Sequence, residues 1–223
     1  ADCGARFVLT HAAVAASLPE WQREAPELER LRFLRTEDLA AADGDGSVPT
    51  PKPEAVAFLQ YTSGSTASPR GAVVSHGNVI ANLECIKEAF AGDPERDNGV
   101  FWLPQYHDMG LTGGLLLTCW GGGRSTILSP LSFVKRPLVW LRAITRTGPT
   151  ISGGPNFAYD LCLQRVSDAD LEELDLGTWR IAFSGAERVS ARTCLEFARR
   201  FERCGFRADA FQPGYGLAES TLI

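Results

Sequence analysis

The sequence has 223 residues, of which 44% are hydrophobic and 22% charged, with a formal net charge of −5 and a pI near 5.3. This is the composition of a globular protein large enough to bury a core, and its acidity argues against nucleic acid as a partner, because nucleic-acid-binding surfaces are usually basic. The longest apolar stretch, residues 115–120, is far too short to span a bilayer, so no stable membrane insertion is expected.

Six cysteines are scattered along the chain without a CxxC pair, and there are only three histidines. The pattern indicates free thiols in a reducing compartment rather than a disulfide framework or a zinc site, so a cytoplasmic location is expected. The sequence begins without methionine or a signal peptide and ends directly after a motif-rich stretch. We therefore expect it to be an excerpt of a longer polypeptide.

Short β-branched or aromatic runs alternate with amphipathic helical segments, which predicts an α/β fold with a largely parallel β-sheet flanked by helices. Several runs are almost continuously hydrophobic, as strands covered on both faces are. In chain order, strands are expected at Phe7–Thr10, Val56–Thr62, Gly71–Ser75, Val100–Leu103, Ser125–Leu128, Thr150–Ser152, Arg180–Ser184 and Ala208–Gln212. Segment Ala40–Pro53, rich in Ala, Asp, Gly and Pro, is expected to be a surface linker.

Three helices are clearest in the sequence. After Asn78, apolar residues recur at helical spacing as far as Phe90, and a second helix is expected to begin near Pro155. In the third, Ser190 is a candidate N-cap and Gly205 occupies the place of a C-terminal glycine cap.

Residues 61–71, with the sequence YTSGSTASPRG, lie between two predicted strands and are suited to bind phosphate. The hydroxyl groups are hydrogen-bond donors, and Gly64 permits a positive φ that would let consecutive N–H groups point at an anion. Arg70 adds a fixed positive charge. The segment lacks the GxxxxGK[ST] pattern of a P-loop, and by composition alone a Ser/Thr-rich hairpin loop without a ligand is an equal alternative.

Four further strings contain candidate site residues. In WLPQYHDMGL, a lone His107 is more often structural than catalytic, and no His–Asp pair is predicted because adjacent side chains rarely face each other. The glycines of SGGPNFAYDL, residues 152–161, would allow close approach of a ligand or simply form a tight turn. The turn SGAE, residues 184–187, would leave a flat slot for a planar base. In GYGLAEST, Tyr215 could stack on a purine and Glu219 is an oxygen ligand suited to Mg²⁺.

In this order and spacing, the five strings resemble the motifs of the adenylate-forming superfamily, which includes acyl-CoA synthetases, peptide-synthetase adenylation domains, luciferases and fatty acyl-AMP ligases. The resemblance runs from Phe7 to Leu222 and is closest to the fatty acyl-AMP ligases. Three positions depart from many members: Ala67 replaces Gly, Arg70 replaces Lys, and Ala218 replaces Thr. Fatty acyl-AMP ligases commonly share that last alanine. The resemblance implies that residues 1–223 are a central fragment of the large AMP-binding N-terminal domain, without its start or the mobile C-terminal domain.

The resemblance also implies a reaction. A long-chain fatty acid would attack the α-phosphorus of ATP, with Mg²⁺, to give acyl-AMP, and the acyl group would pass to an acyl carrier protein or to coenzyme A. Catalytic roles are implied for Arg70, His107 and Glu219, and Glu219 would also be the metal ligand. The implied nucleotide-binding residues are Thr62, Ser63, Gly64, Ser65, Thr66, Gly71, Ser184, Gly185, Ala186, Glu187, Tyr215, Gly216, Leu217, Ala218 and Thr221. The implied substrate-binding residues are Gly153, Gly154, Phe157 and Gly214.

Two other functions stay open at this point. One is a long-chain acyl-CoA synthetase, which is thought to differ in an insertion beyond Ile223. The other is a non-catalytic nucleotide- or acyl-binding module, against which the intact Tyr215 and Glu219 argue. The ribose-binding aspartate and the catalytic lysine of the family have no counterpart before Ile223, so the isolated chain is expected to form acyl-AMP slowly or not at all.

Overall fold

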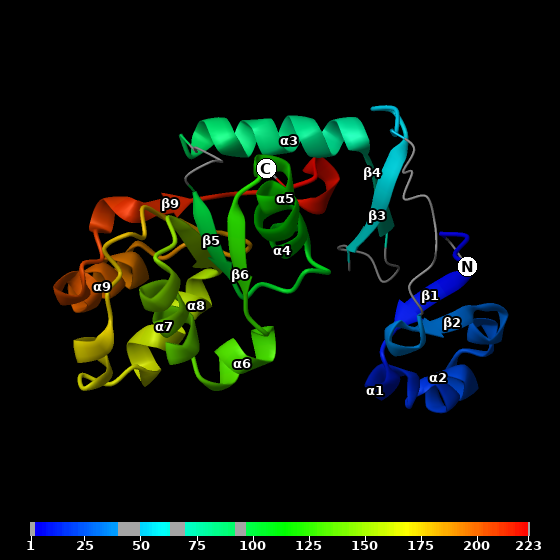
Figure 1. Ribbon diagram of the computed structural model, residues 1–223, viewed down its shortest axis with the longest axis horizontal. Helices are drawn as coiled ribbons and strands as arrows, with labels where there is room; N and C mark the ends of the chain where they lie inside the picture. Colours follow the sequence, from blue (N-terminus) through cyan, green and yellow to red (C-terminus); the bar gives the residue numbers. More distant parts are fainter. Residues whose placement is uncertain (1–2, 40–49, 63–69, 92–96, 223) are drawn as a thin grey trace. The chain divides into compact units, whose positions relative to one another are not determined.

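The computed structural model describes residues 3–39, 50–62, 70–91 and 97–222, and the chain forms two compact units, Ala1–Pro51 and Lys52–Ile223 (Figure 1). The boundary between the units falls in the predicted linker Ala40–Pro53, although residues 40–49 of that linker lie outside the described residues. Within the described part of the chain, no helix has the length and apolar character needed to cross a membrane.

The first unit is a pair of parallel strands with short helices between them. Its elements are β1 Phe7–Thr10, α1 Ala12–Ala15, α2 Leu18–Glu24, a 3-10 turn Pro26–Arg30, β2 Arg32–Arg35 and a 3-10 turn Thr36–Asp38. Strand β1 has the predicted bounds. Strand β2 was not predicted, because arginines on both sides of Phe33 and Leu34 leave no apolar run long enough to indicate a strand.

The second unit contains a five-stranded sheet in the order β6-β5-β7-β8-β9, and all its neighbours are parallel. The strands are β5 Asn98–Phe101, β6 Arg124–Ile127, β7 Ile151–Gly154, β8 Ile181–Ser184 and β9 Phe211–Pro213. The predicted α/β fold with a largely parallel sheet is confirmed. Because the strands are parallel, their carboxyl ends lie along one edge, where open α/β sheets bind ligands.

Helices and short helical turns connect these strands. They are α3 His76–Ala89, α4 Asp108–Gly110, a π-helical stretch Leu111–Leu116, α5 Leu117–Gly121, α6 Pro130–Lys135, α7 Leu138–Thr147, α8 Asn156–Arg165, a 3-10 turn Asp170–Glu173, α9 Ala191–Phe201, and 3-10 turns Glu202–Cys204, Ala208–Ala210 and Ala218–Ser220. For α9, the predicted Ser190 cap is confirmed, since its side chain accepts a hydrogen bond from the Thr193 N–H at 3.3 Å. Gly205, the predicted glycine cap of this helix, instead caps the 3-10 turn Glu202–Cys204 that follows α9, with a φ of +85°.

An antiparallel hairpin of β3 Val56–Thr62 and β4 Arg70–Ser75 precedes α3. The prediction that α3 begins after Asn78 is wrong by three residues, because Ser75 and Asn78 form a capping box. The Asn78 N–H donates to Ser75 Oγ at 3.1 Å, and the Ser75 N–H donates to Asn78 Oδ1 at 3.0 Å. Asn78 therefore lies in the first turn and closes the cap rather than preceding the helix.

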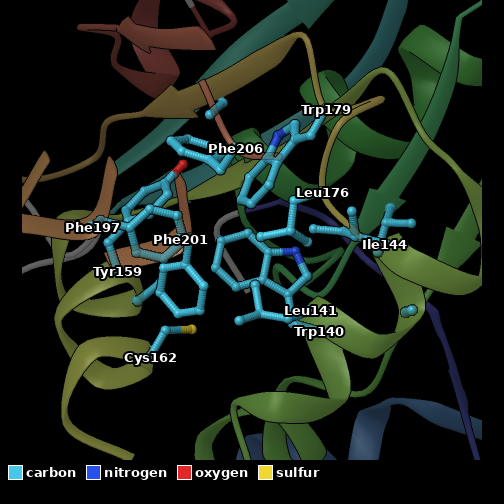
Figure 2. Close-up of a cluster of buried hydrophobic side chains, with 14 of the residues drawn as sticks. Trp140, Leu141, Ile144, Tyr159, Cys162, Leu176, Trp179, Phe197, Phe201 and Phe206 are labelled. Carbon is cyan, nitrogen blue, oxygen red and sulfur yellow. The ribbon is translucent and has the colours of Figure 1, made fainter. Parts of the chain in front are cut away.

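Two faces of the sheet have different partners. Alternate residues on one face, including Val100 and Ala182, belong to the main core with α7, α8 and α9, whereas Phe101, Ile151 and Ile181 form a smaller cluster on the other face. The main core is rich in aromatic rings, as Figure 2 shows. The second cluster packs against the partly buried Phe90 and Phe183. Fewer buried apolar side chains therefore cover this face of the sheet than cover the face of the main core.

The aromatic side chains of the main core hydrogen-bond to the strands. Trp140 Nε1 donates to Ser152 Oγ at 2.8 Å, Tyr159 Oη donates to the Phe183 carbonyl at 2.7 Å, and Trp179 Nε1 donates to the Ile181 carbonyl at 2.9 Å. These three hydrogen bonds tie the core side chains to strands β7 and β8, whereas the buried Trp102 Nε1 has no hydrogen-bond partner among the described residues.

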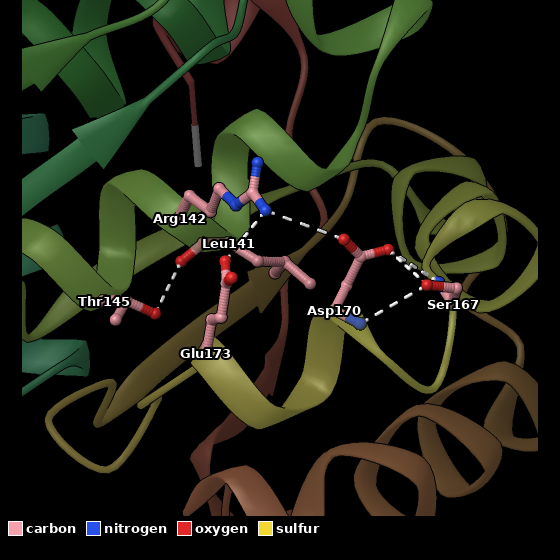
Figure 3. Close-up of polar contacts among 6 residues, drawn as sticks. All are labelled: Leu141, Arg142, Thr145, Ser167, Asp170 and Glu173. Carbon is pink, nitrogen blue, oxygen red and sulfur yellow. Dashed lines mark hydrogen bonds and ion pairs between the residues drawn. The ribbon is translucent and has the colours of Figure 1, made fainter.

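Polar contacts join α7 to the turn that precedes β8 (Figure 3). Arg142 lies 2.9 Å from Glu173 and 3.7 Å from Asp170, and the Ser167 hydroxyl donates to Asp170 at 2.6 Å. The Ser167 hydrogen bonds, followed by the charge of Arg142, lower the pKa of the Asp170 carboxyl. Because these groups are solvent-exposed, we assign them a role in local geometry rather than a large share of stability.

Candidate active site

A cavity of about 390 Å³ opens where β8 and β9 end, at the carboxyl edge of the sheet. Two turns contribute most of its polar wall, residues 184–186 after β8 and residues 214–219 after β9. The predicted site residues in its lining are Thr62, His107, Ser184, Gly185, Ala186, Gly214, Tyr215, Gly216, Leu217, Ala218 and Glu219. The structure therefore brings residues from four of the five sequence motifs around one cavity.

The two turns fit against each other through bare backbone. The Gly214 N–H donates to the Ser184 carbonyl at 2.8 Å, and a Cβ atom at Gly185 would lie only 2.8 Å from the Gly214 carbonyl oxygen. Position 185 therefore requires glycine. Ala186 follows with a φ of +64°, and Thr221 beyond the second turn has a φ of +76°. Positive φ in residues with a Cβ is sterically strained and is found mostly where function requires a particular backbone path.

Ser184 has a hydroxyl group with no protein partner among the described residues. The side chain is 1% exposed and lines the cavity, yet its Oγ makes no hydrogen bond there. Buried hydroxyls are nearly always hydrogen-bonded, so this atom is suited to meet a polar group of a ligand. This unpaired hydroxyl is one polar contact that the cavity offers a ligand.

Tyr215 and Glu219 project from the second turn. The Tyr215 side chain is 85% exposed, so its ring is available to stack on a planar base. No group of three or more candidate metal-ligating side chains occurs in the portion of the chain that the structure describes. Glu219 is nevertheless exposed to the cavity, and Mg²⁺ commonly takes one or two carboxylates plus phosphate oxygens and water, so a single glutamate fits nucleotide-bound Mg²⁺.

His107 forms an ion pair with Asp108, which corrects the expectation that these neighbours do not face each other. His107 Nδ1 lies 2.6 Å from Asp108 Oδ1, because His107 is extended and caps the short helix α4 while Asp108 is its first residue. The hydrogen bond to Asp108 raises the pKa of His107 against the opposing effect of partial burial. Burial acts to raise the pKa of Asp108, but the hydrogen bond and charge of His107 outweigh it and lower that pKa. Since Asp108 occupies Nδ1, a ligand would meet Nε2.

Replacing Asp108 with asparagine is expected to bring the pKa of His107 down towards its ordinary value of 6.5. The ion pair stabilises the fold fully below that value, and this contribution disappears as pH rises through the higher folded-state pKa. Histidine NMR titrations of the wild type and of Asp108→Asn, with His76 as the internal reference, measure the difference. Equal His107 titration in both proteins would contradict the ion pair.

The profile of the AMP-binding enzyme family matches residues 1–223.

The chain belongs to the AMP-binding enzyme family.

Individual members of the family resemble it over most of its length. A medium-chain-fatty-acid–acyl-carrier-protein ligase of Teredinibacter turnerae is 44% identical, and the match covers 78% of this chain and 27% of the relative. A putative fatty-acid–CoA ligase of Mycobacterium bovis is 39% identical, and the match covers 100% of this chain and 39% of the relative. The crystal structure of a fatty acyl-adenylate ligase from L. pneumophila, in complex with acyl adenylate and pyrophosphate, has a TM-score of 0.83 and 41% identity over 95% of the chain and 36% of that protein. The predicted resemblance to fatty acyl-AMP ligases is confirmed, and the chain spans well under half the length of these relatives.

Several predicted residues of this AMP-binding enzyme lie outside the cavity lining. A Cβ atom at Gly153 would meet the Phe183 carbonyl oxygen at 2.2 Å, and one at Gly154 would meet the Trp102 ring at 2.5 Å, so both glycines are required by strand packing. The Phe157 ring packs edge-on against Trp102 with centroids 5.9 Å apart. These packing contacts explain the identity of Gly153, Gly154 and Phe157 without a bound substrate. The substrate-binding role of the three residues stays a prediction.

Glu187 also has a structural partner. Its Oε1 accepts a hydrogen bond of 2.6 Å from the Phe157 N–H, in the first turn of α8, where a carboxylate complements the helix dipole. The structure thus places the Glu187 carboxylate at a helix N-terminus rather than in the cavity lining.

The hairpin residues have mixed positions. Thr62 lines the cavity, whereas Arg70 is exposed at the start of β4 and is absent from the lining. Gly71 lies opposite Tyr61, whose ring would be 3.1 Å from a Cβ at this position, so glycine makes room for the tyrosine. Thr221 is buried beside the second turn, outside the lining. The predicted phosphate-binding residues Ser63, Gly64, Ser65 and Thr66 lie outside the described residues.

Sequence reasoning did not identify the apolar part of the cavity wall. This part consists of Ile86, Phe90, Met109, Ile151, Phe183 and Leu222. In the sequence these residues belong to ordinary hydrophobic helix and strand patterns, which indicate core packing and cannot distinguish a core side chain from one that faces a cavity.

Proposed function

We propose that the protein containing this chain is an ATP-dependent ligase that activates a fatty acid as acyl-AMP and transfers the acyl group to the phosphopantetheine thiol of a carrier protein. The observation that supports this most directly is the two-ended cavity. One end has bare backbone turns, the unpaired Ser184 hydroxyl and the Glu219 carboxylate, and the other is apolar, with Ile86, Phe90 and Ile151. An acyl adenylate has the same division between a polar nucleotide and an apolar chain.

The nucleotide end is proposed to bind adenine on the backbone of residues 184–186. The glycine at 185 lets the turn of residues 184–186 pack closely against Gly214, and the exposed ring of Tyr215 would cover the base. The Ser184 hydroxyl would then gain the hydrogen-bonding partner that it lacks in the described protein. This arrangement would fix the α-phosphate at the boundary between the polar and apolar ends of the cavity.

The reaction brings two anions together, a carboxylate and a triphosphate, so the protein must supply charge neutralisation and in-line positioning. Mg²⁺, when bound, would neutralise phosphate oxygens, and Glu219 is the residue proposed to hold it. His107, whose pKa is raised by its hydrogen bond to Asp108, would present Nε2 to the reacting groups, and in its protonated form would donate to an anionic oxygen. Arg70 and the hydroxyl groups of residues 62–66 are proposed to bind the departing pyrophosphate.

The chain itself is proposed to be the central part of the AMP-binding N-terminal domain of a longer, cytoplasmic enzyme. It spans 27% to 39% of the two curated relatives compared above. Because residues outside this span would be needed to bind the ribose and to complete catalysis, the isolated chain should form acyl-AMP slowly or not at all. Robust ATP–pyrophosphate exchange by the isolated chain would contradict this.

The test uses the full-length protein with dodecanoate, ATP and Mg²⁺. Products are resolved once with coenzyme A and once with a phosphopantetheinylated carrier protein. We expect acyl-AMP to persist with coenzyme A and to be consumed by the carrier. Efficient acyl-CoA formation would support the acyl-CoA synthetase alternative instead, which is the activity named for the putative fatty-acid–CoA ligase of Mycobacterium bovis. Nucleotide binding without any product would indicate a non-catalytic module.

A further inference from the structure

A second, smaller cavity of about 50 Å³ lies beside the first and is lined by residues of α3, β5 and α5. Its wall is mostly apolar and includes Phe101, Leu117 and Trp120. Three side chains, Ile86, Phe90 and Ile151, line both cavities, and they therefore form the partition between the two spaces. All three lie at the apolar end of the larger cavity, so the smaller one continues that end.

Polar groups around the smaller cavity are already engaged within the protein. The Thr118 hydroxyl donates to the Gly114 carbonyl at 2.8 Å, and the Asp97 carboxylate lies 3.1 Å from the Arg180 guanidinium. The Lys87 ammonium group lies 5.8 Å from the centre of the Trp120 ring. A polar ligand would have to break these contacts, whereas an alkyl chain would only add apolar packing.

Of the three partition residues, Phe90 is the most exposed. Ile86 is 2% and Ile151 8% exposed, whereas Phe90 is half-buried and follows the last residue of α3. Its backbone is held at both ends, since its N–H donates to the Ile86 carbonyl at 3.0 Å and its carbonyl accepts from Arg180 at 3.1 Å. Motion at this position is therefore confined to the ring.

The neighbouring Phe101 ring is held more firmly. A Cβ atom at Gly99 would lie 2.1 Å from this ring, and one at Gly114 would lie 3.4 Å from it, so the ring occupies space that two glycines leave open. Phe101 also stacks against Phe183 with centroids 6.3 Å apart. The fixed ring forms part of the floor, and Phe90 remains the movable part of the partition.

We propose that Phe90 is a specificity-determining residue that sets the length of the acyl chain. This inference rests on the proposed ligase function. With the Phe90 ring in its present position, the larger cavity ends at the partition and accepts a shorter acid. A longer chain reaches the smaller cavity only when the ring is displaced or removed.

The experiment compares kcat/KM for hexadecanoate and octanoate in acyl-AMP formation by the full-length protein. Phe90→Ala is expected to raise the ratio of hexadecanoate to octanoate by about tenfold or more, as burial of two further methylene groups would give. Phe90→Leu should raise it less, and it carries the test if the alanine variant is unstable. Ile80→Ala is the matched control, because Ile80 is 43% exposed on the same helix and lines neither cavity. It should leave the ratio unchanged.

A second substitution tests whether the gain comes from the smaller cavity. Adding Leu117→Phe to Phe90→Ala should fill that cavity and return the ratio towards the wild-type value. If the wild type forms acyl-AMP but neither Phe90 variant changes the ratio, the chain-length role is overturned and the proposed function stands. If the wild type forms no acyl-AMP from any acid, the proposed function fails and this inference falls with it.

Discussion

Alanine at Glu219 is expected to lower kcat/KM for acyl-AMP formation by the full-length protein about a hundred- to a thousandfold. The cavity contains this carboxylate at the end that we assign to the nucleotide, and the loss removes the proposed protein ligand of Mg²⁺. Metal-bound charge stabilisation is worth several kcal/mol in the transition state, and each 1.4 kcal/mol corresponds to about a factor of ten in rate. The measurement is pyrophosphate release as a function of Mg²⁺ concentration, in which the variant should also require more Mg²⁺.

Two further variants isolate the role of charge at position 219. Glu219→Gln keeps the size of the side chain and should lose nearly as much activity as alanine. Glu196→Ala removes an exposed carboxylate on α9 that lies 2.8 Å from Arg192, outside the cavity lining, and should change neither rate nor Mg²⁺ dependence. A Glu219→Ala enzyme with wild-type Mg²⁺ dependence would exclude Glu219 as the metal ligand.

Replacing Trp140 with alanine is expected to lower the free energy of unfolding by about 3–5 kcal/mol, the usual cost of truncating a large buried aromatic side chain. Trp140 is fully buried and lies edge-on to Trp179 with ring centroids 5.2 Å apart. Its loss also removes the 2.8 Å hydrogen bond to Ser152 on β7. Since domains are stable by only about 5–15 kcal/mol, much of the protein should unfold at moderate urea concentrations.

The stability experiment follows urea unfolding by near-ultraviolet circular dichroism. Trp140→Phe should lower the free energy of unfolding less than Trp140→Ala does, because a phenyl ring still fills part of the space. Trp21→Ala is the control, since Trp21 is 40% exposed and its removal should change stability by less than about 0.5 kcal/mol. Equal unfolding of the Trp140→Ala and Trp21→Ala proteins would show that the aromatic core is not what stabilises the sheet.

The fold could be predicted where local pattern and tertiary structure agree. Strands β1 and β3 have their predicted bounds because apolar or β-branched runs end at polar or turn residues. Strand β5 is Asn98–Phe101 instead of Val100–Leu103, since Trp102 and Leu103 are buried without continuing the ladder. Hydrophobicity reports burial, and burial alone does not distinguish a paired residue from one that follows a strand.

The sequence located the two turns that line the cavity, whereas it did not indicate the apolar part of the cavity wall. Turns made of glycine and alanine, and a glutamate beside them, leave a recognisable pattern because their chemistry tolerates few substitutes. The pairing of His107 with Asp108 depends on the extended backbone of one residue, which the sequence does not encode in an obvious form. Phe90 could not be recognised at all, because its position at the end of α3 decides that it borders two cavities.

The positive φ angles of Ala186 and Thr221 each lower the stability of the folded chain. A left-handed backbone costs a residue with a Cβ roughly 1–2 kcal/mol, and glycine would relieve most of that cost. A sequence selected only for thermal stability would have glycine at both positions. Keeping side chains there makes the turns stiffer before any ligand arrives, so the pocket requires little reshaping on binding, and thermal stability is lower in return.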